Sequence, residues 1–284
     1  MLSPTDCLTA IAAHSTGLAD VIREHPDHPD HPSPFDAVVP SCPGWTVADL
    51  VSHVIGVHWF WATIVEDRLT DQPGDELVRP DRAPHDQLVT TLEAGARRLV
   101  RVLEAADPSA HVWTWAPTRQ DVGFVVRHQV QEIAVHHWDA VSALGGTLTL
   151  EPEVAADAID EFLTVSISSD VDPAGDGAPV LDGTFALRCV DAAPAPITGP
   201  IAGPIAGPLL GTAGPPAPRA WRVTDGDAPG TMRAIGTLGA ADGAPTISAS
   251  ASDLLLWLYE RVEVDTSAVD PTLLQRFRSL TYTT

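Results

Sequence analysis

Apolar residues recur at helical spacing near the start of the chain, from about residue 4 to residue 23. Leu8, Ile11, Leu18 and Ile22 form a roughly continuous stripe, as the 3.6-residue period of an α-helix requires. The tract HPDHPDHPSP follows, and its prolines prevent the helix from continuing. The pattern therefore predicts a first amphipathic helix that ends before this tract.

A second helix is predicted in the stretch SCPGWTVADLVSHVIGVHWFWATIVED. Pro43 and Gly44 favour a turn, and Thr46 is a suitable N-cap with Asp49 three residues later. The helix that begins there has a broad apolar surface. Its apolar residues are Leu50, Val51, Val54, Val57, Phe60, Trp61 and Ile64.

Two further helices are predicted in the first half of the chain. One runs from about residue 84 to residue 106, and its leucines face inward while its arginines lie outside. These residues are Leu88, Leu92, Leu99 and Leu103, and Arg97, Arg98 and Arg101. The other runs from about residue 121 to residue 144 and stops at Gly145-Gly146, a common helix terminator. Four long helices imply an antiparallel bundle.

The pattern changes in the second half. A fifth helix, at about residues 151–168, is predicted to bridge to a second domain. Short strand-like runs follow, TFALRCV, RAWRVTD, TMRAIGTL and PTISASA, bounded by Gly, Asp and Pro. The amphipathic segments SASDLLLWLYERV and PTLLQRFRSL predict two closing helices. We therefore expect an α+β domain after the bundle.

The expected fold class is an all-α four-helix bundle in residues 1–150 followed by a smaller α+β domain in residues 151–284. A Gly- and Pro-rich stretch at about residues 192–218 contains tandem GPIA units. These units are too few for a solenoid, so the stretch is predicted to be a mobile loop.

Composition places the chain among globular proteins, with 44% hydrophobic and 19% charged residues, and its formal net charge is −22. Such a surface repels nucleic acid and anionic membranes, so neither is expected as a partner. No apolar run approaches the ~18–20 residues of a membrane span. The start lacks the pattern of a signal peptide. We expect a cytoplasmic monomer or homodimer, with a composition compatible with a salt-tolerant or high-GC actinobacterial host.

Two groups of reactive side chains have plain alternatives. Cys7, Cys42 and Cys189 are widely spaced and form no CxxC motif, so neither a disulfide framework nor a thiolate zinc site is indicated. Cys42 is either a nucleophile or, the preferred interpretation, a loop or core cysteine. The histidines of the proline-rich tract, which are His25, His28 and His31, suggest either metal binding or, more commonly, a solvated loop.

A constellation with clearer chemistry lies in the fourth predicted helix, RHQVQEIAVHHWDA. Glu132 and His136 are four residues apart, so both project from one helix face and can reach one ion. His53 lies mid-way along the second helix, on a face expected to be buried. Helical bundles bind metals with such residues. A His/His/Glu set leaves coordination positions open, which suits a catalytic divalent metal.

Spacing alone leaves other interpretations open. A buried histidine is usually a hydrogen-bonded core residue, and an ExxxH pair arises by chance in helices. His128 is four residues before Glu132, so an HxxxExxxH stripe is an alternative set of ligands. His58 and His137 lie close to the candidate ligands in the sequence and compete with them.

The motifs VPSCPGWTVADLVSHV and QEIAVHHWDA resemble the mycothiol-dependent maleylpyruvate isomerase family, within the DinB-like four-helix superfamily. The late segment SASDLLLWLYER resembles the C-terminal domain of these proteins, so the resemblance extends over nearly the whole chain. It implies that His53, Glu132 and His136 bind a divalent metal, usually zinc, completed by water and by the thiol cosubstrate mycothiol. It also implies a small electrophilic substrate.

The resemblance further implies a catalytic arginine from the C-terminal domain, for which Arg261 is the nearest equivalent. A plain alternative is that Arg261 supplies a favourable charge at a helix end. The chain departs from the family pattern at Gln131, where relatives often have His, and at His137, where Arg is usual. These departures leave the ligands in place but put substrate specificity in doubt.

Residues beside the candidate ligands have two interpretations each. Asp139 either accepts a hydrogen bond from a metal-bound imidazole, and thereby fixes its tautomer, or pairs within the bundle. The tryptophans Trp45, Trp59 and Trp61 either line an apolar pocket or, the preferred interpretation, pack in the core.

The leading hypothesis is a metal-dependent enzyme that ionises mycothiol for an isomerase or S-transferase reaction, with Arg261 holding a substrate carboxylate. One alternative is a non-catalytic binding protein on the same scaffold, because fold resemblance does not guarantee chemistry. Another is a metal-dependent hydrolase, in which Asp139 or His128 would be the general base.

Overall fold

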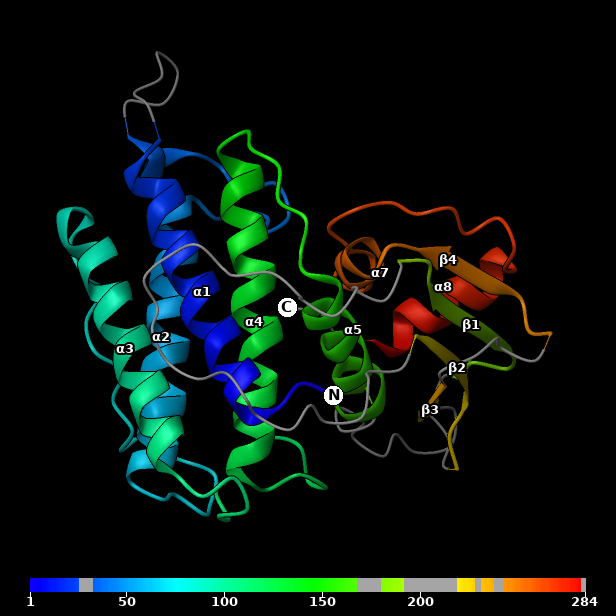
Figure 1. Ribbon diagram of the computed structural model, residues 1–284, viewed down its shortest axis with the longest axis horizontal. Coiled ribbons are helices and arrows are strands. Elements are labelled where there is room, and N and C mark those ends of the chain that lie inside the picture. The colour runs from blue at the N-terminus through cyan, green and yellow to red at the C-terminus, as the bar shows by residue number, and fades with distance from the viewer. Residues whose placement is uncertain (26–32, 168–179, 192–218, 228–230, 238–242, 282–284) are drawn as a thin grey trace, which may run out of the picture.

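The computed structural model describes residues 1–25, 33–167, 180–191, 219–227, 231–237 and 243–281. Long helices make up its N-terminal region, and they lie side by side (Figure 1). They are α1 (Pro4–Arg23), α2 (Val47–Glu66), α3 (Leu88–Ala105) and α4 (Val122–Ala143), with short 3₁₀ turns at Pro34–Asp36 and His85–Gln87. α1 packs mainly against α4 and α3, and α2 against α3 and α4.

Local sequence signals explain where these helices begin and end. Ser3 caps α1 and Thr46 caps α2, each in a capping box with an aspartate three residues later. The Asp121 side chain accepts a hydrogen bond from the Phe124 backbone at the start of α4. α4 ends before Gly145, whose φ of +76° lies in the left-handed region that glycine tolerates.

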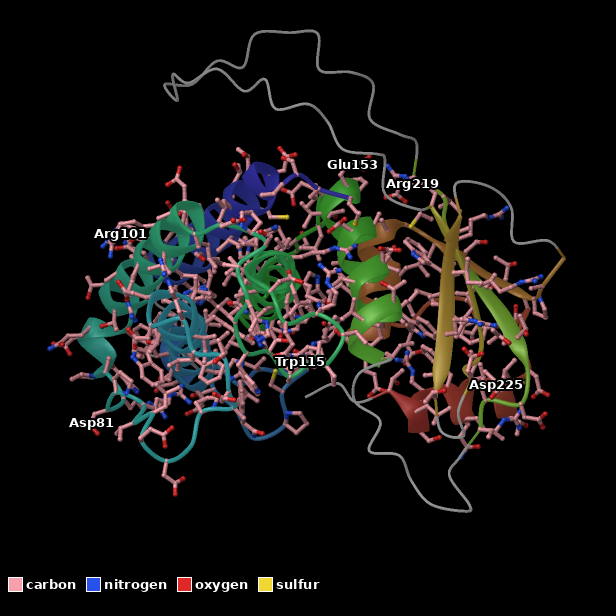
Figure 2. All side chains as sticks on the ribbon, turned by 90° about the horizontal axis from the view of Figure 1, so that it is seen from below. Asp81, Arg101, Trp115, Glu153, Arg219 and Asp225 are labelled. Atoms are coloured by element: carbon pink, nitrogen blue, oxygen red, sulfur yellow. The ribbon has the colours of Figure 1, made fainter. Side chains whose placement is uncertain are left out.

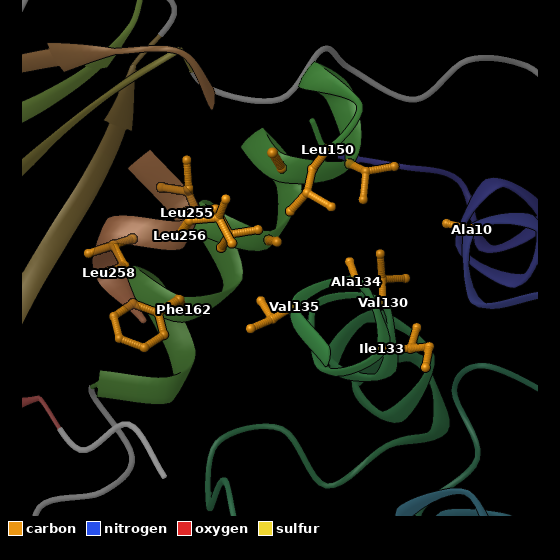
Figure 3. Close-up of a cluster of buried hydrophobic side chains, with 14 of the residues drawn as sticks. Ala10, Val130, Ile133, Ala134, Val135, Leu150, Phe162, Leu255, Leu256 and Leu258 are labelled. Atoms are coloured by element: carbon orange, nitrogen blue, oxygen red, sulfur yellow. The ribbon is translucent and has the colours of Figure 1, made fainter. Parts of the chain in front are cut away.

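α5 (Pro152–Glu161) lies between the N-terminal helices and the C-terminal sheet (Figure 1). It continues into a π-helix, Phe162–Ser166, a variant of helical geometry that is uncommon in proteins. Apolar side chains fill the space between α4, α5 and α7 (Ala251–Leu258), as Figure 3 shows. Leu150, Phe162 and Leu255 are among those with almost no exposed surface, so the two halves of the chain share one core.

The C-terminal region contains a small mixed sheet with the strand order β3-β2-β1-β4. Its strands are β1 (Thr184–Cys189), β2 (Ala220–Asp225), β3 (Met232–Thr237) and β4 (Thr246–Ala249). β1 and β4 are parallel, whereas the other neighbours are antiparallel. α8 (Pro271–Leu280) covers the sheet through Phe277, whose ring contacts that of Phe185.

An ion pair also joins the sheet to α5. Figure 2 labels its partners, Glu153 on α5 and Arg219, which directly precedes β2. Together with the shared apolar core, this contact fixes how the sheet lies against the helical region. The position of α7 beside α5 follows from the same packing.

The predicted order of a helical region followed by an α+β region is confirmed. All four predicted strands and both closing helices are present. Their ends lie within two residues of the expected ones, except that α7 ends at Leu258, four residues before the end of the predicted segment. The third helix begins later than expected, at Leu88 after a 3₁₀ turn. The fifth changes to π geometry at Phe162, which periodicity could not foresee. His28, His31 and the GPIA stretch lie outside the described residues.

One prediction about apolar segments is wrong. α2 is long and apolar enough by length and composition to cross a membrane, although no segment was expected to approach that length. In the structure, 61% of its apolar window is buried inside the protein. Packing against α3 and α4 therefore accounts for the apolar character of α2.

Candidate metal site between α2 and α4

The structure brings His53 of α2 together with Glu132 and His136 of α4. The Nε2 atom of His53 lies 3.0 Å from the Oε1 atom of Glu132. The Nε2 atom of His136 lies 3.4 Å from the same oxygen. His53 was expected on a buried face, but its side chain is 33% exposed because it borders a cavity. The three side chains thus converge at a point that solvent can reach.

These three side chains fit a divalent metal ion by geometry and by chemistry. Their ligand atoms all lie within 4.8 Å of one another. Ligands bound to zinc at about 2.0–2.1 Å in tetrahedral geometry are separated by roughly 3.3 Å, close to the distances found here. Two imidazoles and one carboxylate also leave a coordination position for another ligand.

Opposite charges face each other within the cluster. Burial raises the pKa of the Glu132 carboxyl, but His136 and then His53 outweigh burial and hold that pKa well below its usual range. Burial lowers the pKa of His136, but Glu132 and Asp139 raise it to about 9. A proton on His136 therefore occupies the place that a divalent cation would take, and binding of the ion would release it.

Asp139 lies behind His136, on the side away from Glu132. Its Oδ2 atom is 3.0 Å from the Nδ1 atom of His136, so a proton on Nδ1 leaves Nε2 free to bind an ion. The Ser41 hydroxyl donates a hydrogen bond to its Oδ1 atom over 2.6 Å. Ser41 was not predicted as a site residue, although it lies in the SCPGW turn that carries the family resemblance.

Arg261 reaches the same carboxylate from the C-terminal region. Its Nε and Nη2 atoms donate to the two oxygens of Asp139, each over 3.1 Å, and Nη1 donates to the backbone oxygen of Tyr259. Its side chain is only 6% exposed. The guanidinium therefore positions Asp139 through a two-pronged ion pair and does not face the cavity beside His53.

Cys42 lies at the edge of this group. Its Sγ atom is 3.7 Å from Asp139 and 3.6 Å from the Nη2 atom of Arg261. Burial, and then the charge of Asp139, raise the pKa of the thiol. Cys42, His136 and Asp139 are close enough together to form another set of metal ligands. A protonated thiol and a carboxylate already bonded to Ser41 and Arg261 make this set a poorer fit than the one with His53.

A cavity of about 920 Å³ opens beside His53, between α2, α3 and the loops before them. Trp45 and Trp59 line it, and the centroid of the Trp45 ring lies 5.1 Å from that of the His53 ring. Trp61 is instead buried in the core, with 5% of its surface exposed. Trp45 and Trp59 thus line a pocket, whereas Trp61 packs in the core.

The competing histidines lie elsewhere. His128 is surrounded by the rings of Trp61, Trp115 and Phe124, and its Nδ1 atom lies 3.0 Å from the Gln131 amide nitrogen. His137 faces α1, where its Nδ1 atom lies 3.1 Å from that of His14. His58 is buried, and neither of its ring nitrogens has a hydrogen-bond partner among the described residues. None of the three belongs to either set of candidate ligands found in the described residues.

Comparison with known proteins agrees with the motifs around these ligands. Residues 13–141 match the family described as the mycothiol maleylpyruvate isomerase N-terminal domain. The matched range contains His53, Glu132, His136 and Asp139, but not Arg261. No curated protein and no solved structure shows significant similarity to the chain. Residues 13–141 therefore belong to the family described as the mycothiol maleylpyruvate isomerase N-terminal domain.

Proposed function

We propose that this protein is a zinc-dependent enzyme that uses mycothiol, either as an isomerase of the maleylpyruvate type or as an S-transferase. The observation that carries the proposal is the convergence of His53, Glu132 and His136 at metal-ligand distances beside an open cavity. Membership of the family points to mycothiol as the thiol. We also propose that residues 1–150 form a DinB-like four-helix domain and residues 151–284 a second domain.

His53, Glu132 and His136 would hold the ion, and another divalent metal would suit the same donors. A bound divalent ion supplies a positive charge that lowers the pKa of a thiol beside it. Asp139 holds the His136 ring in the tautomer that presents Nε2, and Arg261 and Ser41 hold Asp139. Trp45 and Trp59 form apolar walls next to His53, which limit the access of water to the reacting groups.

The two versions of the reaction share their first step. The sulfur of the cosubstrate adds to one carbon of an activated cis double bond, and the electron pair moves to the conjugated carbonyl group. In the isomerase version, rotation about the new single bond and departure of the same sulfur give the trans isomer. In the transferase version, the adjacent carbon takes up a proton and the thiol conjugate is the product.

A hydrolase is less well supported by the geometry. Asp139, one proposed general base, is fully buried and is bonded to Ser41, His136 and Arg261. His128, the other, lies within an aromatic cluster away from the candidate ligands. Neither is free to activate a water molecule at the point where His53 and Glu132 meet.

Metal content and thiol chemistry test the proposal together. Zinc-loaded protein incubated with mycothiol and maleylpyruvate should yield fumarylpyruvate or a stable conjugate, separated by chromatography. His53→Ala and Glu132→Gln should each lower the activity by at least about 100-fold, because loss of a group that only supports a ligand already costs 10–100-fold. His111→Gln, which changes an exposed histidine outside the cavity, is the matched control. A preparation that binds no stoichiometric zinc and is unchanged by His53→Ala would favour a non-catalytic binding protein.

A further inference from the structure

Three arginines line the cavity beside His53, and two of them are neutralised by carboxylates. The Nη1 atom of Arg82 lies 2.6 Å from Asp49, and the Nη2 atom of Arg98 lies 2.5 Å from Glu66. Arg79 forms no ion pair with any residue that the structure describes. Its Nη2 atom donates a hydrogen bond over 2.7 Å to the backbone oxygen of Ser52. Arg79 thus brings an unneutralised positive charge to the cavity.

The surface of α2 is shaped to receive this guanidinium. Gly56 lies opposite it, and a Cβ atom at this position would overlap the Arg79 side chain. Glycine within a helix costs roughly 1 kcal/mol relative to alanine, so close approach gives a physical reason for its presence here. Gly56 follows His53 by three residues and therefore lies on the same face of α2. Arg79 is thus held about one helical turn from a candidate metal ligand.

The loop that carries Arg79 is fixed to α2 at two points. Arg79 bonds to Ser52 and Arg82 bonds to Asp49, so partners three residues apart in the loop meet partners three residues apart in the helix. Figure 2 labels Asp81 on this loop, at the edge of the molecule far from the sheet. These two contacts hold the Arg79 guanidinium in place, and its other N–H groups remain able to donate hydrogen bonds.

The cavity offers an unpaired cation on a strongly negative protein, whose formal charge is −22. With Arg82 and Arg98 paired, Arg79 and Asp81 are the remaining Arg and Asp residues of the lining, and no ion pair joins them among the described residues. Arg79 is an exposed residue, so an anion in solution can reach its guanidinium. Arg261, by contrast, is already paired with Asp139 and is 6% exposed. An anionic group that enters this cavity therefore meets Arg79.

We propose that Arg79 is the residue that binds a carboxylate group of the electrophilic substrate, one helical turn from His53 in the cavity lined by Trp45 and Trp59. The free edge of the guanidinium offers paired N–H donors, which match the two oxygens of a carboxylate. Bound there, the substrate's carboxylate directs its reactive carbon toward the candidate metal site. This inference rests on the proposed function for the identity of the substrate, but the carboxylate site itself can be tested without the reaction.

Binding of maleate, a small cis-dicarboxylate, tests the site directly. Maleate is titrated into zinc-loaded protein, and the quenching of tryptophan fluorescence gives the dissociation constant. Arg79→Gln should weaken binding about tenfold or more, since a charge-assisted pair is lost. Gly56→Ala should weaken it in the same direction, because it displaces the guanidinium and keeps its charge. Arg101 lies on α3 outside this cavity and is labelled in Figure 2. Arg101→Gln therefore removes the same charge at another place and should change maleate binding less than twofold.

The outcomes separate this inference from the proposed function. With an electrophile that carries a carboxylate, Arg79→Gln should raise KM about tenfold and leave kcat nearly unchanged. With an uncharged electrophile, it should change neither constant. If maleate binding depends on Arg79 but no thiol reaction is found, the carboxylate site is supported and the proposed function is contradicted.

Three results would overturn the inference while leaving zinc binding and thiol chemistry intact. The first is an absence of saturable maleate binding by the parent protein. The second is equal binding by the parent and by Arg79→Gln. The third is loss of maleate binding only in Arg261→Gln, which would assign the carboxylate to the C-terminal arginine.

Discussion

Two polar clusters contain residues of α4. They differ in how completely other groups of the protein bond to their charged side chains. The closed cluster contains Arg127, Asp157, Asp160 and Trp221. Arg127 donates to both aspartates, over 2.9 Å to Asp157 and 2.8 Å to Asp160, and the Trp221 indole donates to Asp160 over 3.0 Å. At most 13% of any of the three charged side chains is exposed. The charged side chains of this cluster thus all have bonding partners within the protein.

The open cluster contains His53, Glu132 and His136. One carboxylate is shared by two imidazoles, and both the His53 and the Glu132 side chains are partly exposed. The cluster borders a cavity, whereas the closed cluster joins α4 to α5 and the sheet. Buried charge by itself therefore does not mark a functional site. Convergent ligand atoms that are accessible and not saturated by protein groups distinguish the open cluster.

The largest expected effect separates the clusters by stability. Arg127→Met should lower the free energy of unfolding by about 3–5 kcal/mol, because it leaves two buried carboxylates without their cation. Urea denaturation measures this loss. Arg23→Met is the matched control, since Arg23 forms exposed pairs with Asp20 and Glu93, and it should destabilise the protein far less than Arg127→Met. The zinc stoichiometry of folded Arg127→Met should equal that of the parent. Equal destabilisation by both variants would contradict the distinction between buried and exposed pairs.

The next prediction concerns metal affinity. Asp139→Asn should weaken zinc binding by about 10–100-fold, because the amide holds the His136 ring in its binding tautomer less strongly than a carboxylate does. Competition with a chromophoric chelator measures the change. Asp157→Asn makes the same replacement in the closed cluster and should leave zinc affinity within about threefold of the parent, because it lies outside the proposed ligands and their supports. If both variants lose affinity equally, the effect is a general one on folding, and Asp139 has no special role.

The smallest effect concerns a buried histidine that belongs to neither cluster. Burial lowers the pKa of His58 to about 4, below the ordinary value of 6.5 that it has when unfolded. The unfolded chain therefore binds this proton first as the pH falls, and stability is lost from pH 6.5 downward until the folded side chain is protonated near its own pKa. Between pH 7.5 and 5.5 this loss amounts to about 1.3 kcal/mol.

His58→Leu removes this loss. As the pH falls from 7.5 to 5.5, the free energy of unfolding of the variant, relative to that of the parent, should therefore increase by the same amount. Urea denaturation at both pH values measures the difference. His85→Leu, at an exposed position, should show no such increase. His137 contributes in the same direction in parent and variants, because burial lowers its pKa to about 4 as well. A difference between His58→Leu and the parent that does not change with pH would show that His58 is hydrated or hydrogen-bonded in solution.

Most of the fold could be predicted from local pattern. The capping residues Ser3, Thr46 and Asp121 and the terminating Gly145 act within a few residues, so sequence alone places these helix ends. The strands were recognised for the same reason. The π-helix at Phe162 was missed, because the spacing of apolar residues does not distinguish π geometry from α geometry in so short a segment.

The candidate site was only partly accessible to sequence analysis. Spacing placed Glu132 and His136 on one face of α4 and His53 mid-way along α2, and the resemblance to the family favoured these three as ligands of one ion. The partners of Asp139 could not be found in this way, because Ser41 and Arg261 are 98 and 122 residues away from it. Arg79 was missed as well, since it lies in a loop without helical or strand periodicity. Arg261 was expected to hold substrate, but the structure shows its guanidinium paired with Asp139.

The sequence by itself determined the helices, the strands, the family and the residues able to bind a metal, because each depends on local spacing or on a short motif. Only the tertiary structure decided which charges neutralise one another. Arg261 and Arg79 are the same residue type, yet one lies against a buried aspartate and the other lies over a glycine in an open cavity. Pairing of charges depends on distances between segments far apart in the chain, and folding alone sets those distances.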